Sequence, residues 1–201
     1  MAYATVAELR AHMGIVATDT SEDTRLSDAL DAATAWIDSL CGQSFAATSA
    51  TRTFAARDLW TLDLTGSPLT STITSIKTDA GFDGTFETTL ATTDYLLLPV
   101  GGRQLDGSTG PYTSVRYVTS VWPIDWVYGR PGVQIIGTFG WAAVPAAVKS
   151  ACLLQAAHLQ ASKDTPLGIA GFGDIGIRTV RGENPMVRAL LSKFMVKAAV
   201  A

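Results

Sequence analysis

Few residues in this chain have the types and spacing for chemistry, and one glycine run is the most suggestive. Gly171-Phe-Gly-Asp-Ile-Gly176 matches the G-x-G-x-x-G pattern, which brings backbone amides close to a dinucleotide pyrophosphate. That site requires a strand before the glycines and a helix after them. Here a helical pattern precedes the run and an extended one follows it. The order of elements argues against a nucleotide site and favours a loop that approaches a partner closely.

The histidines and cysteines do not combine into a catalytic or metal site. His12 and His158 are the only histidines, and no G-x-S-x-G nucleophile motif accompanies them. Cys41 and Cys152 form neither a CxxC pair nor a disulfide framework. Both stand among apolar neighbours in helix-like segments, which predicts buried, reduced thiols. We therefore expect no cofactor and no metal.

Two larger groups of side chains could serve a ligand. Four carboxylates share one helical segment: Asp23, Asp28, Asp31 and Asp38. They are typical of a solvated helix face. An enzyme stays an alternative, because folding can bring together two acids that are distant in the sequence. Four aromatic residues lie late in the chain: Trp122, Trp126, Tyr128 and Trp141. The simplest interpretation is that these rings lie in the core and at the rim of a β module. The alternatives are a protein interface and a platform that stacks against a sugar or a base.

The composition favours a protein that is buried in an assembly. Of 201 residues, 47% are hydrophobic and only 16% are charged, against roughly 25% charged in an average globular protein. The net charge of −3 provides no basic surface for gripping nucleic acid or an acidic membrane. No stretch reaches the ~20 apolar residues of a membrane span. The first residues lack the basic and apolar regions of a secretory signal.

The N-terminal segment predicts two helices. Thr5-Val-Ala-Glu8 is a capping-box pattern, and Gly14 is placed to end the short helix that follows. Residues 22–41 then carry apolar side chains at helical spacing, with Gly42 as the expected C-cap.

The C-terminal segment predicts two more helices with an arm between them. A helix from Pro145 to Ser162 is apolar on most sides, so we expect most of its surface to be covered. Pro166 prevents its continuation, and a glycine-rich, partly extended arm spans residues 165–182. Asn184-Pro185 pairs an N-cap residue with proline at the first helical position, which predicts a closing amphipathic helix.

The middle of the chain is dense in Thr, Val, Ile and aromatic residues, which is typical of strands and turns. The strand candidates are 59–64, 72–78, 86–90, 95–98, 112–119 and 133–139, with a turn at 79–84. We therefore predict an α+β fold. A small α-helical bundle forms from the N- and C-terminal parts, residues 1–50 and 140–201, and an antiparallel β module, residues 51–139, is inserted into it.

The sequence of the two helical ends resembles a known family. Gly140-Trp-x-x-Val-Pro-x-x-Val, an alanine-rich helix and Thr165-Pro-Leu-Gly-Ile-Ala-Gly-Phe-Gly-Asp-Ile-Gly are the main features. Together with Tyr3-Ala-Thr-Val-Ala-Glu-Leu-Arg and Asn184-Pro, they resemble the head-to-tail connector (adaptor, head-completion) proteins of long-tailed double-stranded DNA bacteriophages. The resemblance covers about half of the chain and none of its motifs is catalytic; the β insertion is where such proteins vary.

The resemblance implies a structural virion protein and no enzyme. Such a protein would be made in the host bacterial cytoplasm and would form a ring, usually a dodecamer, in the virion neck. The ring would bind beneath the portal protein and join the DNA-filled head to a stopper or tail-completion protein. DNA would pass through its channel without specific binding, and no membrane would be involved.

The resemblance also implies which residues make contacts. The arm would reach the portal, with these candidates: Gly168, Phe172, Ile175, Ile177, Arg178, Val180 and Arg181. Subunit contacts would come from the long helix and the β module, with these candidates: Lys149, Gln155, His158, Trp126 and Tyr128.

Three other functions stay open. The chain could be another neck or tail-completion protein, in which the β module dominates. It could be a small carbohydrate-binding module or enzyme that uses the aromatic insertion. It could also be an unrelated cytoplasmic helical protein.

Overall fold

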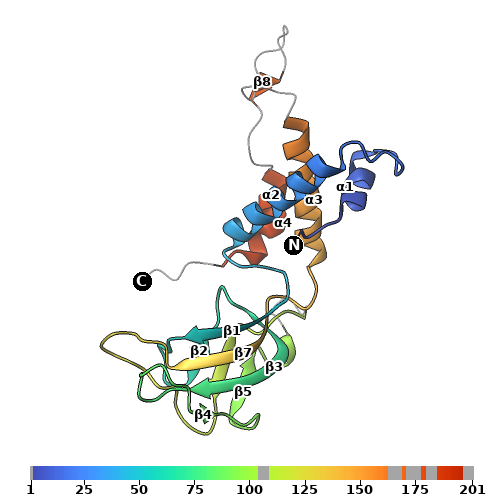
Figure 1. The fold of residues 1–201 in the computed structure, drawn as a ribbon. Helices are drawn as coiled ribbons and strands as arrows, with labels where there is room; N and C mark the ends of the chain where they lie inside the picture. The colour runs from blue at the N-terminus through green and yellow to red at the C-terminus, as the bar shows by residue number, and fades with distance from the viewer. Residues whose placement is uncertain (1, 104–108, 163–168, 171–177, 180–184, 197–201) are drawn as a thin grey trace. The chain divides into compact units, whose positions relative to one another are not determined.

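The computed structural model describes residues 2–103, 109–162, 169–170, 178–179 and 185–196 (Figure 1). The chain divides into two compact units. The helical unit comprises Met1–Gly42 and Val144–Ala201, and the β module comprises Gln43–Ala143. The predicted α+β class is confirmed, because one unit holds the α-helices and the other holds antiparallel sheets. The division falls at 42/43 and 143/144, whereas the sequence places it at 50/51 and 139/140.

In the described residues of the helical unit there are four α-helices and a 3-10 turn: α1 (Val6–Met13), α2 (Asp23–Cys41), α3 (Ala146–Ser162), α4 (Pro185–Leu191) and η3 (Ser192–Phe194). The capping box of α1 is confirmed. The Thr5 hydroxyl accepts the Glu8 amide at 3.3 Å, and the Glu8 carboxylate accepts the Thr5 amide at 2.9 Å. Gly14 and Gly42 end α1 and α2 in the left-handed conformation.

The core of the helical unit lies around α3, which packs against α1, α2 and α4. Of the apolar positions predicted on α2, Leu40 is half-buried and the others are buried: Leu26, Ala29, Leu30, Ala33 and Ile37. Across from them α3 buries Val148, Ala151, Cys152 and Ala156. The Thr34 hydroxyl accepts the Tyr3 amide at 3.3 Å and lies 3.6 Å from the Cys152 sulfur. This cluster ties the N-terminal segment to both long helices.

Where the structure describes the β module, seven strands form two antiparallel sheets: β1 (Thr48–Phe54), β2 (Thr61–Asp63), β3 (Leu69–Thr78), β4 (Thr88–Thr89), β5 (Tyr95–Leu98), β6 (Ser114–Tyr117) and β7 (Val133–Phe139). A 3-10 turn, η1 (Val100–Gly102), follows β5. The sheet orders are β1-β7-β3-β4 and β2-β6-β5. The strand predicted at 86–90 is the shorter β4 in the structure, and it pairs antiparallel with β3. β1 is missing from the predicted strands because its residues, Thr-Ser-Ala-Thr-Arg-Thr-Phe, are mostly polar, although exposed and half-buried positions alternate along it in the structure.

The two sheets share one hydrophobic core. The sheet β1-β7-β3-β4 contributes Ile76, Ile135 and Phe139, and the sheet β2-β6-β5 contributes Leu62 and Val115. Along β7 buried and half-buried residues alternate strictly, as a strand with one covered face requires. Because each sheet turns one face to this core, the opposite faces are left for solvent or for partners.

A third, two-stranded sheet lies in the arm. β8 (Ile169–Ala170) pairs antiparallel with β9 (Arg178–Thr179), so that Ile169 is opposite Thr179. The extended segment expected after the glycine run is therefore a strand, and it pairs with the residues before that run.

Gly140 provides a test of how closely the β module is packed. An added Cβ there would lie 2.1 Å from the Ala46 carbonyl oxygen, and φ is +104°. At Gly84, φ is +92° but nothing lies within 4 Å. We expect Gly84→Ala to cost about 1–3 kcal/mol through backbone strain. Gly140→Ala should cost about 1–3 kcal/mol more, because the Ala46 backbone must move.

The measurement is chemical denaturation of the full chain, followed by the fluorescence of the β-module tryptophans. Equal loss of stability in the two variants would show that the chain at Gly140, directly after β7, is not closely packed.

Candidate protein-interaction surfaces

Most of the candidate portal-binding arm lies outside the described residues. This applies to Gly168, Phe172, Ile175, Ile177, Val180 and Arg181. Arg178 lies in β9, where its backbone is opposite Ala170. The β8–β9 pairing brings the two ends of the glycine run side by side.

The subunit-contact candidates on α3 are Lys149, Gln155 and His158, and they differ in how far they are buried within the helical unit. The Lys149 ammonium forms an ion pair with the exposed Glu8 carboxylate of α1. The hydrogen bond that Lys149 donates is the main reason why the pKa of Glu8 is below its ordinary value. Gln155 is 2% exposed, so its side chain packs inside the unit and offers no free surface. His158 is half-buried.

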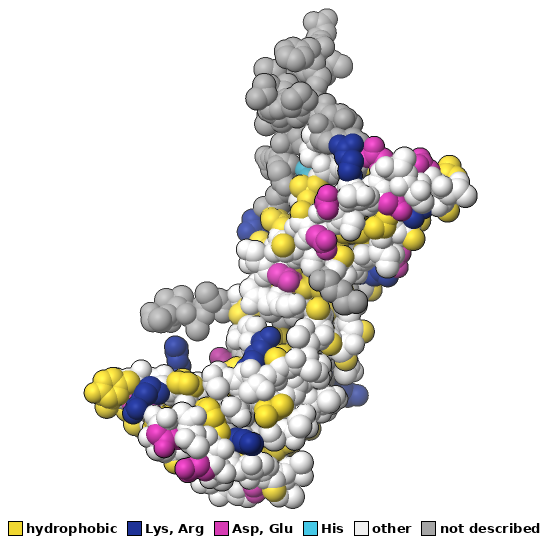
Figure 2. Space-filling view, in the orientation of Figure 1, with side chains coloured by type: hydrophobic (Ala, Val, Ile, Leu, Met, Phe, Trp, Pro, Cys, Tyr) yellow, Lys and Arg dark blue, Asp and Glu magenta, His cyan; other side chains and the backbone are white. Residues whose placement is uncertain are grey.

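The β-module candidates Trp126 and Tyr128 lie in a short turn between β6 and β7, residues 125–130, which we call the aromatic turn. Trp126 is 75% exposed, Val127 77% and Tyr128 78%. Figure 2 shows hydrophobic side chains standing out beside basic ones at an edge of the β module. Three consecutive apolar side chains at such exposure are typical of an interaction site.

Asp125 holds the aromatic turn in one conformation. Its carboxylate accepts the amides of Val127 at 3.1 Å and Tyr128 at 3.0 Å. The other oxygen forms an ion pair with the Arg130 Nε at 2.6 Å. These bonds, first of all the one from Arg130, lower the pKa of Asp125 to about 2. Arg130 also donates to the Phe82 carbonyl at 2.9 Å, which anchors the turn to the loop after β3.

The other aromatic candidates do not join the exposed pair. Trp122 is 1% exposed in the module core, and its Nε1 donates to the Trp60 carbonyl at 3.2 Å. Trp141 is half-buried, with its ring 5.7 Å from that of Phe45. The structure therefore does not bring the four aromatic side chains together as a ligand platform.

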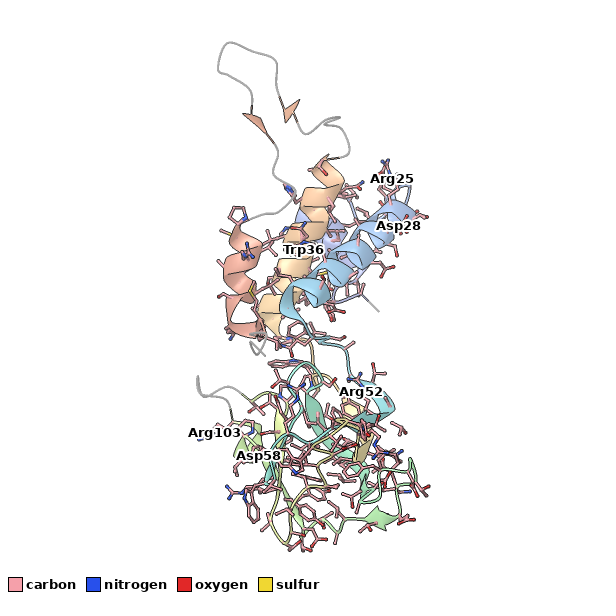
Figure 3. All side chains as sticks on the ribbon, turned by 90° about the vertical axis from the view of Figure 1, so that its left-hand side faces the viewer. Arg25, Asp28, Trp36, Arg52, Asp58 and Arg103 are labelled. Carbon is pink, nitrogen blue, oxygen red and sulfur yellow. The ribbon has the colours of Figure 1, made fainter. Side chains whose placement is uncertain are left out.

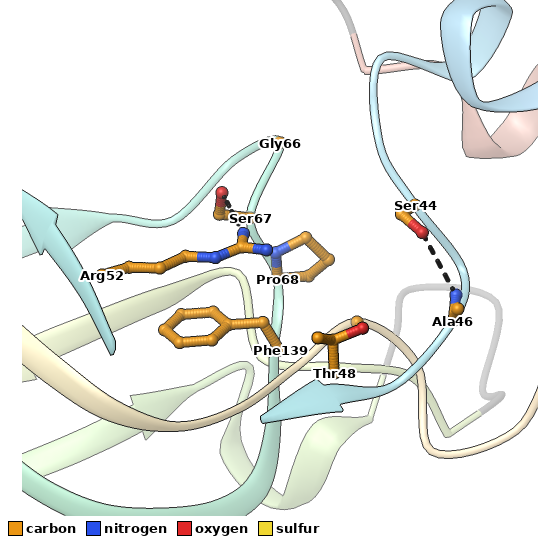
Figure 4. Close-up of a pocket in the computed structure, with 9 residues that line it drawn as sticks. Ser44, Ala46, Thr48, Arg52, Gly66, Ser67, Pro68 and Phe139 are labelled. Atoms are coloured by element: carbon orange, nitrogen blue, oxygen red, sulfur yellow. Dashed lines mark hydrogen bonds between the residues drawn. The ribbon is translucent and has the colours of Figure 1, made fainter. Parts of the chain in front are cut away.

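A small cavity near the start of β1 does not resemble a ligand site. It measures about 160 Å³ and lies among residues of the 44–68 segment and the end of β7 (Figure 4), against roughly 300–1,000 Å³ for typical ligand pockets. Its one cation, Arg52, already donates to the Ser67 hydroxyl at 2.7 Å. The Arg52 guanidinium also lies 4.5 Å from the centre of the Phe139 ring.

The α2 carboxylates do not form a catalytic pair. Asp28 and Asp31 are exposed, and Figure 3 shows Asp28 near Arg25 on α2. Asp23 forms an ion pair with Arg10 at 3.2 Å. Burial raises the pKa of Asp38, and a hydrogen bond from the Tyr3 hydroxyl opposes that change. Among the described residues, no three His, Cys, Asp or Glu side chains group as metal ligands, and no helix is suited to span a membrane.

Sequence reasoning missed Asp125 and Val127 as parts of the exposed site. One signal was available in the sequence: an aspartate side chain can accept the backbone amides two and three residues after it. The ion pair with Arg130 and the anchor at Phe82 had no such signal, because they depend on the folded chain.

Asp125→Ala should release the aromatic turn. We expect the amides of Val127 and Tyr128 to exchange with solvent at least several-fold faster, because they lose their acceptor. In the unaltered chain this protection should be complete above the ordinary carboxyl pKa of 3.8 and be lost as the pH falls through about 2. Hydrogen exchange followed by NMR measures both effects.

Asp63→Ala is the matched control, because Asp63 accepts the Thr65 amide at 2.8 Å in a similar turn. It should leave exchange in the aromatic turn unchanged. Unchanged exchange in Asp125→Ala would contradict the role assigned to Asp125.

The chain resembles one protein family in part of its sequence and solved structures over nearly its whole length. Residues 3–66 match the family described as "Phage gp6-like head-tail connector protein". No curated protein sequence matches the chain. A chain in the neck of an empty GTA particle, computed with C6 symmetry, is 23% identical with a TM-score of 0.61; the match covers 98% of this chain and 92% of that chain.

A second solved structure has the same fold. A chain in the neck of the native GTA particle, computed with C12 symmetry, is 21% identical with a TM-score of 0.56; the match covers 97% of this chain and 90% of that chain. At this identity the likeness establishes the fold. The family match in residues 3–66 and the fold of nearly the whole chain together support a head-tail connector protein.

Proposed function

We infer that this chain is a structural protein of the neck of a phage-like particle. It forms a head-to-tail adaptor ring that binds beneath the portal and joins the DNA-filled capsid to the stopper or tail. The observation that carries this inference is the fold match over 98% of the chain to a neck protein. The family match covers the N-terminal helices and the start of the β module, so it supports the inference independently.

Ring formation is supported by the symmetry of the related necks. Those necks are computed with C6 and C12 symmetry, and we propose a dodecamer for this chain. A ring of this kind repeats one contact between different surfaces of neighbouring subunits. The exposed aromatic turn is suited to such a contact, whereas the buried Gln155 contributes only by keeping α3 in place.

The partners follow from the place in the neck. The arm, residues 165–182, would meet the portal, and another surface would meet the stopper or tail-completion protein. DNA would pass through the channel, and a net charge of −3 is compatible with passage, because added phosphate contacts would strengthen nonspecific binding.

The main alternative is a different neck or tail-completion protein. It would share the fold but would not bind portal rings directly. A carbohydrate-binding module or an enzyme has less support, because the aromatic and acidic candidates are dispersed in the described residues. Direct binding to portal rings would distinguish the adaptor from another neck or tail-completion protein.

The test is to mix the purified chain with portal rings of its own particle and image the complexes by electron microscopy. We expect an added ring with twelve-fold symmetry on one face of the portal. A chain that leaves the portal bare but joins assembled necks would be another neck component instead.

The arm should carry portal binding. Phe172→Ala with Arg178→Glu should abolish docking, because the change removes an apolar anchor and reverses a charge. Val100→Ala with Arg103→Glu is the matched control, since Val100 is 64% exposed and Arg103 is exposed in the β module. The control should dock like the unaltered chain. Normal docking of the arm variant would remove the arm from the portal contact.

A further inference from the structure

The outer face of the sheet β2-β6-β5 carries two exposed apolar side chains, Leu96 and Val118, among polar ones. Thr61 is opposite Arg116 in β6, and Arg116 is opposite Leu96 in β5. Their neighbours along the strands, Leu62 and Val115, are buried in the module core. Because side chains alternate along a strand, Thr61, Arg116 and Leu96 point away from that core.

Val118 extends this outer face beyond the end of β6. It lies two residues after Arg116, and its amide donates to the Asp94 carbonyl at 2.8 Å, which continues the ladder with the chain before β5. Val118 is 56% exposed and Leu96 is 42% exposed. We define the outer face by Thr61, Leu96, Arg116 and Val118.

Arg116 stands between the apolar side chains without a charge partner. It is exposed. Among the residues that the structure describes, its guanidinium makes no ion pair or hydrogen bond. An unpaired guanidinium on an apolar surface is well suited to stack against an aromatic ring.

The aromatic turn has the opposite character. It presents two exposed aromatic rings. Arg130, which is paired with Asp125 at 2.6 Å, lies 5.5 Å from the centre of the Tyr128 ring, whereas no cation of the described residues lies over the Trp126 ring. The turn therefore offers ring faces, and the outer face offers a guanidinium with apolar flanks. Both surfaces are exposed in the same chain, so the aromatic turn does not cover the outer face of its own subunit.

A sugar is a poor occupant for the aromatic turn. Sugar recognition needs hydrogen-bonding groups around the rings and a concave site. The Asp125 carboxylate already accepts two amides and the Arg130 Nε. The Arg130 guanidinium also donates to the Phe82 carbonyl and lies 5.7 Å from the centre of the Phe82 ring and 5.5 Å from that of the Tyr128 ring. The polar groups of the turn are thus used to hold its shape.

We propose that the aromatic turn of one copy packs on the outer face of the next copy, with Trp126 and Tyr128 against Arg116, Leu96 and Val118. The contact is head to tail, because two different surfaces of the same chain meet. Repetition of such a contact closes a ring when the rotation between copies divides a full turn. This proposal rests on the proposed function, since it specifies how neighbouring subunits of that ring touch.

The size of the turn explains why the contact would depend on assembly. Two aromatic side chains and a valine, three-quarters exposed, can bury roughly 400 Å². A stable pair buries about 800 Å² per partner. The contact is therefore too small to hold two free subunits together, but it can act when other neck proteins hold the subunits in a ring.

Cysteine crosslinking tests the contact in portal-bound rings. Tyr128→Cys alone and Val118→Cys alone should give no crosslinked product, because neither surface meets itself. An equal mixture of the two variants should give dimers only. A chain carrying both changes should give a ladder that extends towards the full ring. The natural cysteines, Cys41 and Cys152, are 0% exposed and should stay silent.

Matched variants define the specificity of the crosslink. Val16→Cys with Val118→Cys is the control pair, because Val16 is 70% exposed in the helical unit, and it should give no ladder. Adding Arg116→Glu to the double-cysteine chain should lower the crosslink yield about tenfold, because the Trp126 ring loses its cation.

The outcomes separate the two proposals. Rings that form on portals without crosslinking of the double variant would overturn this contact and leave the adaptor function standing. Dimers from Tyr128→Cys alone would overturn it as well, because the turn would then meet itself. Failure of the unaltered chain to form rings on portals would overturn both.

Discussion

The helical unit depends on the burial of α3, since α1, α2 and α4 all pack against it. α3 has only one charged residue, Lys149, and that ammonium is paired with Glu8 of α1. A helix with so little polar surface is stable only when it is covered. The buried pair Thr34 and Cys152 joins it to α2.

The β module follows the same rule with a different outcome. Its two sheets share one core, so the apolar residues of each strand are divided between a covered face and an outer one. The aromatic turn and the outer face of β2-β6-β5 are two of the places where apolar side chains remain outside. Asp125 keeps the aromatic turn in one conformation although the turn is exposed. The module is therefore built to present these groups, and the low content of charged residues, 16%, agrees with surfaces that partners cover.

Local signals in the sequence were sufficient for much of the fold. The capping box at Thr5 and Glu8, the α2 stripe and the bounds of β7 all follow from short-range patterns, and the structure confirms them. β1 was missed because its polar residues become a strand only by pairing with β7. Gln155 was assigned to a surface because an evenly apolar helix does not reveal which side its neighbours cover. The anchor from Arg130 to Phe82 joins residues 48 positions apart, which no local pattern encodes.

The most direct test of the neck assignment is the mass of the complex between this chain and its portal ring, measured by native mass spectrometry. The account predicts a single added species of twelve 21.2 kDa chains per portal, in line with the C12 symmetry of the related neck. A portal whose mass does not change, or one that carries single chains at random occupancy, would contradict a ring that assembles beneath the portal.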